Sequence, residues 1–128
     1  MIQNEWIHDW NSGGPMAIPA GTRALLNDET LRDGLQNPSI HDPSIEEKIE
    51  ILHLMESLGI ESADIGLPGA GAHVVAEVQR LAEEIGTHRM RIRPYCAART
   101  FFGDIRPIVD ISHQTGCLRR RCEPRNRA

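Results

Sequence analysis

The sequence predicts an α/β protein in which short buried strands alternate with amphipathic helices. Three apolar runs of strand length are each followed by apolar residues at helical spacing, which gives the order βα-βα-βα over residues 22–116. Strands that alternate with helices pair in parallel through right-handed crossovers. An open doubly wound sheet and part of a (β/α)₈ barrel both fit this order. In both architectures, ligands bind at the carboxyl ends of the strands.

The first βα unit begins with the apolar run 24–26, which leads into a polar segment and predicts a buried strand near residues 23–28. Asp42 and Pro43 then supply a helix cap and a first helical residue. The helix that follows is expected to end at Gly59. Its apolar face is formed by Ile45, Ile49, Leu52 and Met55.

The second and third units repeat this pattern. The second unit is a strand at 60–67 and a helix that we expect to end at Gly86. The third is a strand at 90–97 and a helix closed by Gly116. Pro94 argues against a central position for the third strand, because proline has no N–H to donate to a neighbouring strand.

Both flanking segments lack this periodicity. Residues 1–21 mix tryptophan, glycine and proline, and predict an irregular N-terminal arm without a secretory leader. Residues 117–128 contain five arginines and one acidic residue, and predict a basic tail that is disordered or out of frame. A nucleic-acid-binding tail is the alternative interpretation of these arginines.

The amino-acid composition argues against several classes of function. Residues 1–116 carry nine Lys or Arg against seventeen Asp or Glu, and this acidic balance argues against nucleic acid as the main partner. No run approaches the roughly 20 apolar residues of a membrane-spanning helix. We therefore expect a cytoplasmic protein. The three cysteines have no CxxC spacing and predict neither a disulfide framework nor a zinc knuckle.

The residues that carry chemistry follow the first strand directly. Arg32 offers a planar, permanently charged fork to a carbonyl or enolate oxygen. Asp33 is a hard oxygen ligand for a divalent metal, and Gly34 lets the backbone turn away from the site. A simple Arg–Asp ion pair on a surface loop is the alternative.

The segment Asp28-x-Thr30-Leu31-Arg32-Asp33-Gly34-x-Gln36 resembles the signature of the pyruvate-carboxyltransferase-type barrel enzymes. This family includes 2-isopropylmalate synthase, homocitrate synthase, citramalate synthase and hydroxymethylglutaryl-CoA lyase. Residues 63–68 and 97–105 resemble the ends of its second and third strands, with Asp64 where the family has glutamate. Lys48 corresponds to a family lysine, one residue further from Gln36 than is usual. The resemblance favours the barrel over the open sheet.

The resemblance also implies roles for individual residues. Arg32 would be the catalytic arginine, which polarises the 2-keto oxygen and stabilises the thioester enolate. Asp33 would be a ligand of the divalent metal, which is Mg²⁺, Mn²⁺ or Zn²⁺. The substrate-binding residues would be Gln36, Asp64 and Arg99. The implied reaction is a metal-dependent Claisen-type condensation of acetyl-CoA with a 2-keto acid, and full-length relatives are expected to be homo-oligomers.

The family completes its metal site with a His-x-His pair on a later strand, and this chain has none. Its histidines are His8, His41, His53, His73, His88 and His113. One carboxylate cannot hold a metal that takes about six ligands, and a complete barrel needs roughly 250 residues. We therefore expect this chain to be a partial (β/α)₈ barrel that forms the N-terminal portion of the enzyme. Alone, the chain should be inactive. The inner faces of the first and third strands, and part of the surface that packs helices, would then lack partners and should expose apolar patches. The alternatives are lyase-type aldol cleavage, and a catalytically silent fragment or interaction module.

Overall fold

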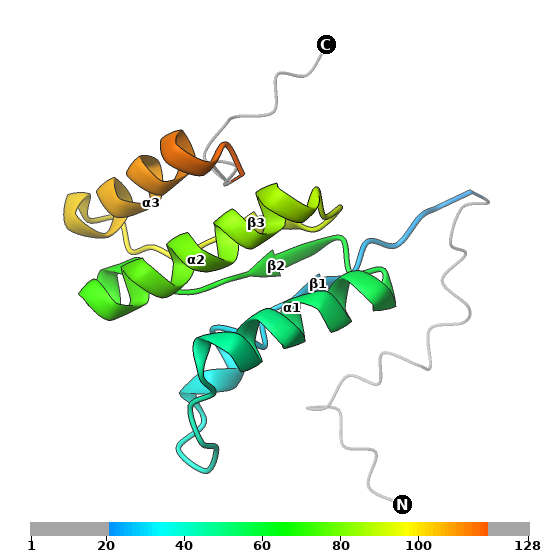
Figure 1. Ribbon diagram of the computed structural model, residues 1–128, viewed down its shortest axis with the longest axis horizontal. Helices are drawn as coiled ribbons and strands as arrows, with labels where there is room; N and C mark the ends of the chain where they lie inside the picture. The colour runs from blue at the N-terminus through cyan, green and yellow to red at the C-terminus, as the bar shows by residue number, and fades with distance from the viewer. Residues whose placement is uncertain (1–20, 118–128) are drawn as a thin grey trace, which may run out of the picture.

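The computed structural model describes residues 21–117, which form one parallel sheet and a layer of helices (Figure 1). The predicted arm and basic tail lie outside the described residues, except for Gly21 and Cys117. The predicted order βα-βα-βα is confirmed, with two short 3₁₀ turns added. The elements in order are β1 (Asn27–Asp28), η1 (Gly34–Gln36), α1 (Ile45–Leu58), β2 (Ser62–Asp64), η2 (Pro68–Ala70), α2 (Ala72–His88), β3 (Arg93–Tyr95) and α3 (Phe102–Thr115).

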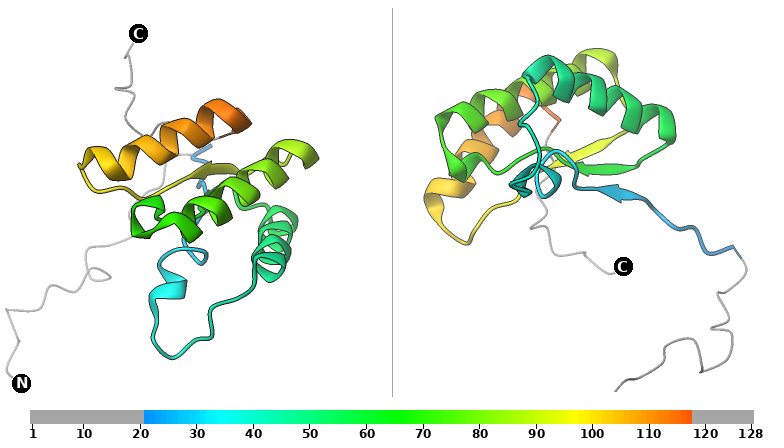
Figure 2. Two further views of the ribbon diagram at one scale, coloured as in Figure 1. Left: turned by 60° about the vertical axis from the view of Figure 1, so that its left-hand side comes forward. Right: turned by 90° about the horizontal axis from the view of Figure 1, so that it is seen from below.

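The three strands pair in parallel in the order β1-β2-β3, as predicted. Ser62 of β2 is in register with Asn27 on one side and Arg93 on the other. β3, which contains Pro94, lies at the edge of the three described strands, in agreement with its missing N–H donor. The three helices cover one face of this sheet (Figure 2). This arrangement is that of consecutive βα units of a (β/α)₈ barrel, whose helices form the outer layer.

The hydrophobic core lies between the sheet and the helices. Ala63 and Ile65 alternate with Asp64 along β2 and its extension, so they face the helices while Asp64 faces the other way. Burying each large apolar side chain contributes about 1.5–3 kcal/mol. The buried core residues are Leu31, Leu52, Met55, Ala63, Ile65, Val78, Leu81, Ala82, Ile85, Ile92 and Ile111.

Helix α1 begins later than the sequence predicts. Its N-cap is Ser44, whose Oγ accepts from Glu47 N (3.3 Å), while Glu47 Oε2 accepts from Ser44 N (2.7 Å). This reciprocal capping box satisfies two backbone N–H groups at the helix start, so it displaces the cap predicted at Asp42. Asp42 instead accepts from the Lys48 ammonium, with Oδ1 and Nζ 3.1 Å apart.

Helix α2 continues past Gly86, so the prediction that this glycine ends the helix was wrong. The helix ends at His88, and Arg89 adopts the left-handed conformation instead, with φ of 50°. Gly86 serves packing: a Cβ there would lie 2.9 Å from Cys117 Sγ, just beyond α3. The absence of a side chain lets the segment after α3 approach α2 closely.

The buried strand predicted around residues 24–26 was also wrong in part. Leu26 O accepts from the backbone N–H groups of Glu61 and Ser62, but strand pairing is regular only from Asn27. Leu25 and Leu26 are 54% and 57% exposed, because β1 is the outer strand of the described sheet and no described segment covers it.

The sheet face turned away from the helices is polar along the described strands, contrary to the expected apolar inner face. Strand alternation places Asn27, Ser62, Asp64, Arg93 and Tyr95 on it. The large exposed apolar side chains lie elsewhere: Leu25, Leu26, Ile40, Leu54, Leu58, Phe101, Phe102 and Ile105. Within residues 21–117, no helix has the length and apolar content needed to cross a membrane.

Candidate active site at the carboxyl ends of the strands

A tight turn after β1 brings Arg32 back over the end of the sheet. Asp28 Oδ1 accepts from Thr30 N at 2.8 Å, and Glu29 O accepts from both Arg32 N (3.1 Å) and Gly34 N (3.2 Å). These bonds satisfy the backbone of the turn locally. The side chain of Leu31, buried in the core, anchors the turn while Arg32 and Asp33 remain at the surface of the site.

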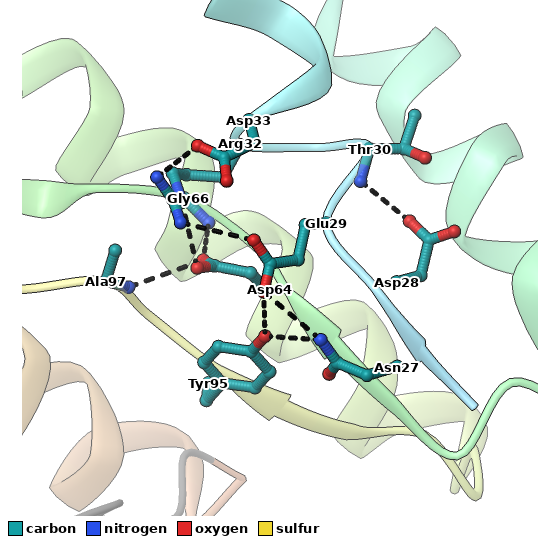
Figure 3. A network of polar contacts seen from close by, with 10 residues as sticks. All are labelled: Asn27, Asp28, Glu29, Thr30, Arg32, Asp33, Asp64, Gly66, Tyr95 and Ala97. Carbon is teal, nitrogen blue, oxygen red and sulfur yellow. Dashed lines mark hydrogen bonds and ion pairs between the residues drawn. The ribbon is translucent and has the colours of Figure 1, made fainter. Parts of the chain in front are cut away.

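Arg32 lies among three carboxylates (Figure 3). Its Nε donates to Asp64 Oδ2 at 3.1 Å, its Nη2 donates to Glu29 Oε2 at 3.3 Å, and its Nη1 pairs with Asp33 Oδ1. Burial on its own lowers the pKa of the Arg32 guanidinium. The hydrogen bond to Asp64 and the surrounding negative charges outweigh that effect and raise the pKa overall. Arg32 is therefore a fixed cation whose orientation is set by its neighbours.

Asp64 is the buried anchor of this arrangement, with only 1% of the residue exposed. Its Oδ1 accepts from Gly66 N (3.1 Å) and Ala97 N (3.3 Å), so it also ties the end of β2 to the loop after β3. Gly66 has φ of 145°, and a Cβ there would lie 2.7 Å from Val78 Cγ2. The backbone approach that satisfies Asp64 therefore requires glycine at this position.

A second group of polar side chains extends the site across the sheet. Asn27 Nδ2 donates to Tyr95 OH at 2.8 Å, and Tyr95 OH donates to Glu29 Oε1 at 3.1 Å. Burial raises the pKa of Tyr95, and the hydrogen bond to Glu29 and the charge of Glu29 raise it further. The hydrogen bond from Asn27 acts in the opposite direction but is outweighed, so the phenol stays protonated. Sequence reasoning missed Tyr95. Its alternation with Pro94 along β3, combined with parallel register, would have placed it beside Asp64.

Gln36 lies at the end of η1, where it lines an open cavity of about 350 Å³ together with Arg32. The cavity is bounded by η1, η2, the first turn of α1 and the first three turns of α2, and residues Leu35, Leu67, His73 and Val74 also line it. On its wall, Lys48 is buried and its Nζ donates to Glu77 Oε2 at 2.9 Å. Burial lowers the pKa of Lys48, but the bonds to Glu77 and Asp42 raise it overall. Lys48 therefore links the two helices as a cation.

Arg99 does not join the Arg32 network. Its Nε and Nη2 donate to Asp104 Oδ2 (2.7 Å) and Oδ1 (2.9 Å), and its backbone N donates to Oδ2 at 3.2 Å. The bonds from Arg99 hold the pKa of Asp104 below its usual value. A Cβ at Gly69 would lie 2.3 Å from this carboxylate, so the pair packs directly against η2. The structure thus brings Arg32, Asp33 and Asp64 together, while Arg99 forms a separate pair beside them.

The donors at the Arg32 site fit a divalent metal only in part. Asp33 is half-exposed, and it offers a carboxylate oxygen of the kind that Mg²⁺ and Mn²⁺ prefer. Glu29 already receives hydrogen bonds from Arg32 and Tyr95. Asp33 is therefore suited to be one ligand among several, and the sequence holds no His-x-His pair to complete the set.

The chain consists of parallel βα units, and an Arg–Asp pair follows the first strand directly. These features define an α/β-barrel type of domain, with its polar site at the carboxyl ends of the strands. Residues 23–116 match the family described as HMGL-like, and the chain belongs to that family. This match confirms the resemblance found in the sequence.

Relatives of known name agree with this assignment. The chain is 37% identical to 2-isopropylmalate synthase of Synechococcus sp. (strain CC9311) over 69% of its length, and 34% identical to homocitrate synthase AksA of Methanopyrus kandleri over 67%. A third relative, 2-isopropylmalate synthase of Parasynechococcus marenigrum, is 41% identical over 50% of the chain. The matches span 16%, 20% and 12% of these relatives, respectively. No solved structure gives a significant match.

Proposed function

We propose that this chain carries the arginine and one metal ligand of a metal-dependent condensing site, which joins acetyl-CoA to a 2-keto acid in a Claisen-type reaction. The observation that carries the proposal is the Arg32 guanidinium, held by Asp64, Glu29 and Asp33 at the carboxyl end of the sheet. The similar proteins named above are synthases, which favours condensation over the lyase-type cleavage.

Arg32 would act by electrostatic stabilisation. In the condensation, negative charge develops on the enolate oxygen of the thioester and on the 2-keto oxygen that becomes an alkoxide. A pre-oriented guanidinium stabilises such charge without reorganising at the moment of reaction. Asp64 and Glu29 supply the orientation, so the energetic cost of ordering the side chain is met when the protein folds.

Asp33 would contribute one carboxylate oxygen to the metal. A bound divalent metal polarises the keto group and so makes the carbonyl carbon a better electrophile. Gln36 would bind the keto acid from the side of the cavity that it shares with Arg32. Asp64 would act on the substrate through Arg32, because its carboxylate is buried and already accepts three hydrogen bonds. We propose that Arg99 must break its ion pair with Asp104 before it binds substrate.

A chimeric enzyme tests the proposal. Residues 23–116 would replace the matched segment of the Synechococcus 2-isopropylmalate synthase, and release of thiol from acetyl-CoA would be followed with pyruvate, 2-ketoisovalerate and 2-ketoglutarate. Metal-dependent turnover would support the proposal. A folded chimera, with the circular dichroism of the parent, that shows no turnover with any keto acid would overturn it. The 128-residue chain assayed alone should be inactive with Mg²⁺, Mn²⁺ or Zn²⁺. Turnover by this chain alone would contradict the proposal that its metal site is incomplete.

A further inference from the structure

A second group of metal-ligating side chains lies between α1 and α2. His53 comes from α1, and Glu84 and His88 lie one turn apart near the end of α2, so both α2 side chains project from the same helix face. The end of each helix precedes the next strand, so the group lies toward the amino ends of the strands. This is the opposite end of the layer from Arg32.

Both imidazoles point at the same carboxylate oxygen. His53 Nε2 lies 2.8 Å from Glu84 Oε1, and His88 Nε2 lies 3.1 Å from it. The two rings meet edge to face with centroids 5.4 Å apart, and the three ligand atoms all lie within 4.8 Å of one another. A tetrahedral zinc ion with bonds of about 2.1 Å separates its ligand atoms by about 3.4 Å. Small side-chain rotations would therefore admit the ion.

The surroundings of Glu84 fix its carboxylate in the required orientation. Glu84 is 8% exposed, and Arg80 Nη1 donates to Oε2 at 3.3 Å, which leaves Oε1 facing the histidines. His53 and His88 are half-exposed on their outer side, which leaves room for a water as fourth ligand. Within residues 21–117, only this group brings three such ligand atoms together.

We propose that His53, Glu84 and His88 form a metal site for Zn²⁺ or a related divalent transition metal, which links α1 to α2. Two imidazoles and one carboxylate, with a fourth position open to water, are a common zinc donor set. We assign the ion a helix-linking role, because its ligands come from both helices and lie at the opposite end of the layer from Arg32. It would stabilise the folded chain because the ligands converge only when the two helices are packed together.

The test uses the 128-residue chain with Zn²⁺ alone in titration calorimetry and Co²⁺ as a spectroscopic probe. We expect one Zn²⁺ per chain, a rise in the unfolding temperature on adding Zn²⁺, and four-coordinate Co²⁺ absorption without the sulfur-to-cobalt band that cysteine ligation would give. His53→Ala, His88→Ala and Glu84→Gln should each weaken binding about 10-fold or more, as losses in a metal's ligand environment do. His113→Ala, which removes an exposed histidine of α3, should leave binding unchanged.

The two histidine variants alter half-exposed side chains, so both should fold, and circular dichroism verifies this. Unchanged Zn²⁺ affinity in folded His53→Ala and His88→Ala chains would overturn the proposal. So would a sulfur-to-cobalt band that disappears when cysteines are replaced by serine, because the cysteines would then hold the ion. A wild-type chain that binds no Zn²⁺ would show that the group is only a hydrogen-bonded His–Glu–His cluster, which also overturns it.

Discussion

The Arg32 guanidinium lies 3.1 Å from the Asp64 carboxylate, although 32 positions separate the two residues along the chain. Parallel pairing creates this contact, because the turn after β1 and the end of β2 meet at the same edge of the sheet. Asp64 contributes to stability as well as to the site, since its two oxygens connect Arg32 with the backbone of Gly66 and Ala97. The buried carboxylate of Asp64 therefore both stabilises the fold and orients the arginine of the candidate site.

Asp64→Asn should destabilise the fold by about 1.5–3 kcal/mol, the contribution of hydrogen bonds to a charged group. The amide keeps the shape of the side chain, but loses the negative charge opposite Arg32 and replaces one acceptor by a donor. Urea unfolding measures the effect. Asp110→Asn is the matched control, because that aspartate is exposed and pairs only at 3.9 Å with Arg106. It should change stability by less than about 0.5 kcal/mol. Equal effects of the two substitutions would contradict the anchoring role of Asp64.

Gly66→Ala should destabilise the chain more than Gly59→Ala. Both glycines have positive φ (145° and 77°), where a side chain adds strain of about 1–3 kcal/mol. At Gly59 the new Cβ meets nothing within 4 Å, whereas at Gly66 it would lie 2.7 Å from the buried Val78. Overpacking of the core should add about another 1–3 kcal/mol. Chemical unfolding of the two variants side by side gives the difference, and an equal loss would refute the packing argument.

Glu56 should make the stability of the chain depend on pH in the acid range. Burial alone raises the pKa of its carboxyl, but hydrogen bonds from Arg91 and from Ile92 N outweigh this and lower the pKa overall. A lowered folded pKa adds stability that is fully present above the unfolded pKa, about 4.3, and is lost as pH falls through the folded pKa.

Glu56→Gln therefore should cost about 1.5–3 kcal/mol at pH 7 and less at pH 3, because pH 3 lies below the unfolded pKa and the charge-dependent stability is lost as pH falls toward and through the lowered folded pKa. Denaturant unfolding at both pH values measures the gap between variant and wild type. Glu50→Gln, at an exposed position of the same helix, serves as the control and should show little gap at either pH. If the difference in unfolding free energy between Glu56→Gln and wild type were the same at pH 7 and pH 3, the charge of Glu56 would not be the source of the stabilisation.

The sequence was sufficient to predict the alternation of strands and helices, because periodicity and glycine positions are local signals. It was also sufficient for the Arg32–Asp33 pair, since two adjacent residues need no tertiary information. Helix boundaries were less predictable. Asp42 and Ser44 are both good caps, and only the reciprocal bonds with Glu47 decide between them. Gly86 has the features of a helix end, but its role is set by the packing of Cys117.

Side-chain pairing between distant segments was the least predictable part of the site. Arg99 could have faced Asp33 or Asp104, and the choice depends on where the loop after β3 runs. Tyr95 becomes part of the site only through its register with Asp64. The His53–Glu84–His88 group likewise depends on how α1 packs against α2, because His53 and Glu84 are 31 positions apart. Such contacts follow from tertiary packing, for which a single sequence contains no direct signal.

The roles proposed for Arg32 and Asp33 should be separable in the chimeric synthase. Asp33→Ala removes the proposed metal ligand, so metal affinity and turnover should fall together by about 10-fold or more. Arg32→Lys keeps the positive charge but loses the fork that reaches Asp64, Glu29 and the reacting oxygen. It should slow turnover by about 100-fold, as loss of an oxyanion donor does, and leave metal affinity nearly unchanged. Arg106→Lys, an exposed site on α3, is the matched control and should leave both quantities unchanged. Steady-state rates at saturating metal, together with metal titrations of each variant, distinguish the two effects. An Arg32→Lys chimera with full turnover would remove the catalytic role of the arginine, and an Asp33→Ala chimera with full metal affinity would remove the ligand role of the aspartate.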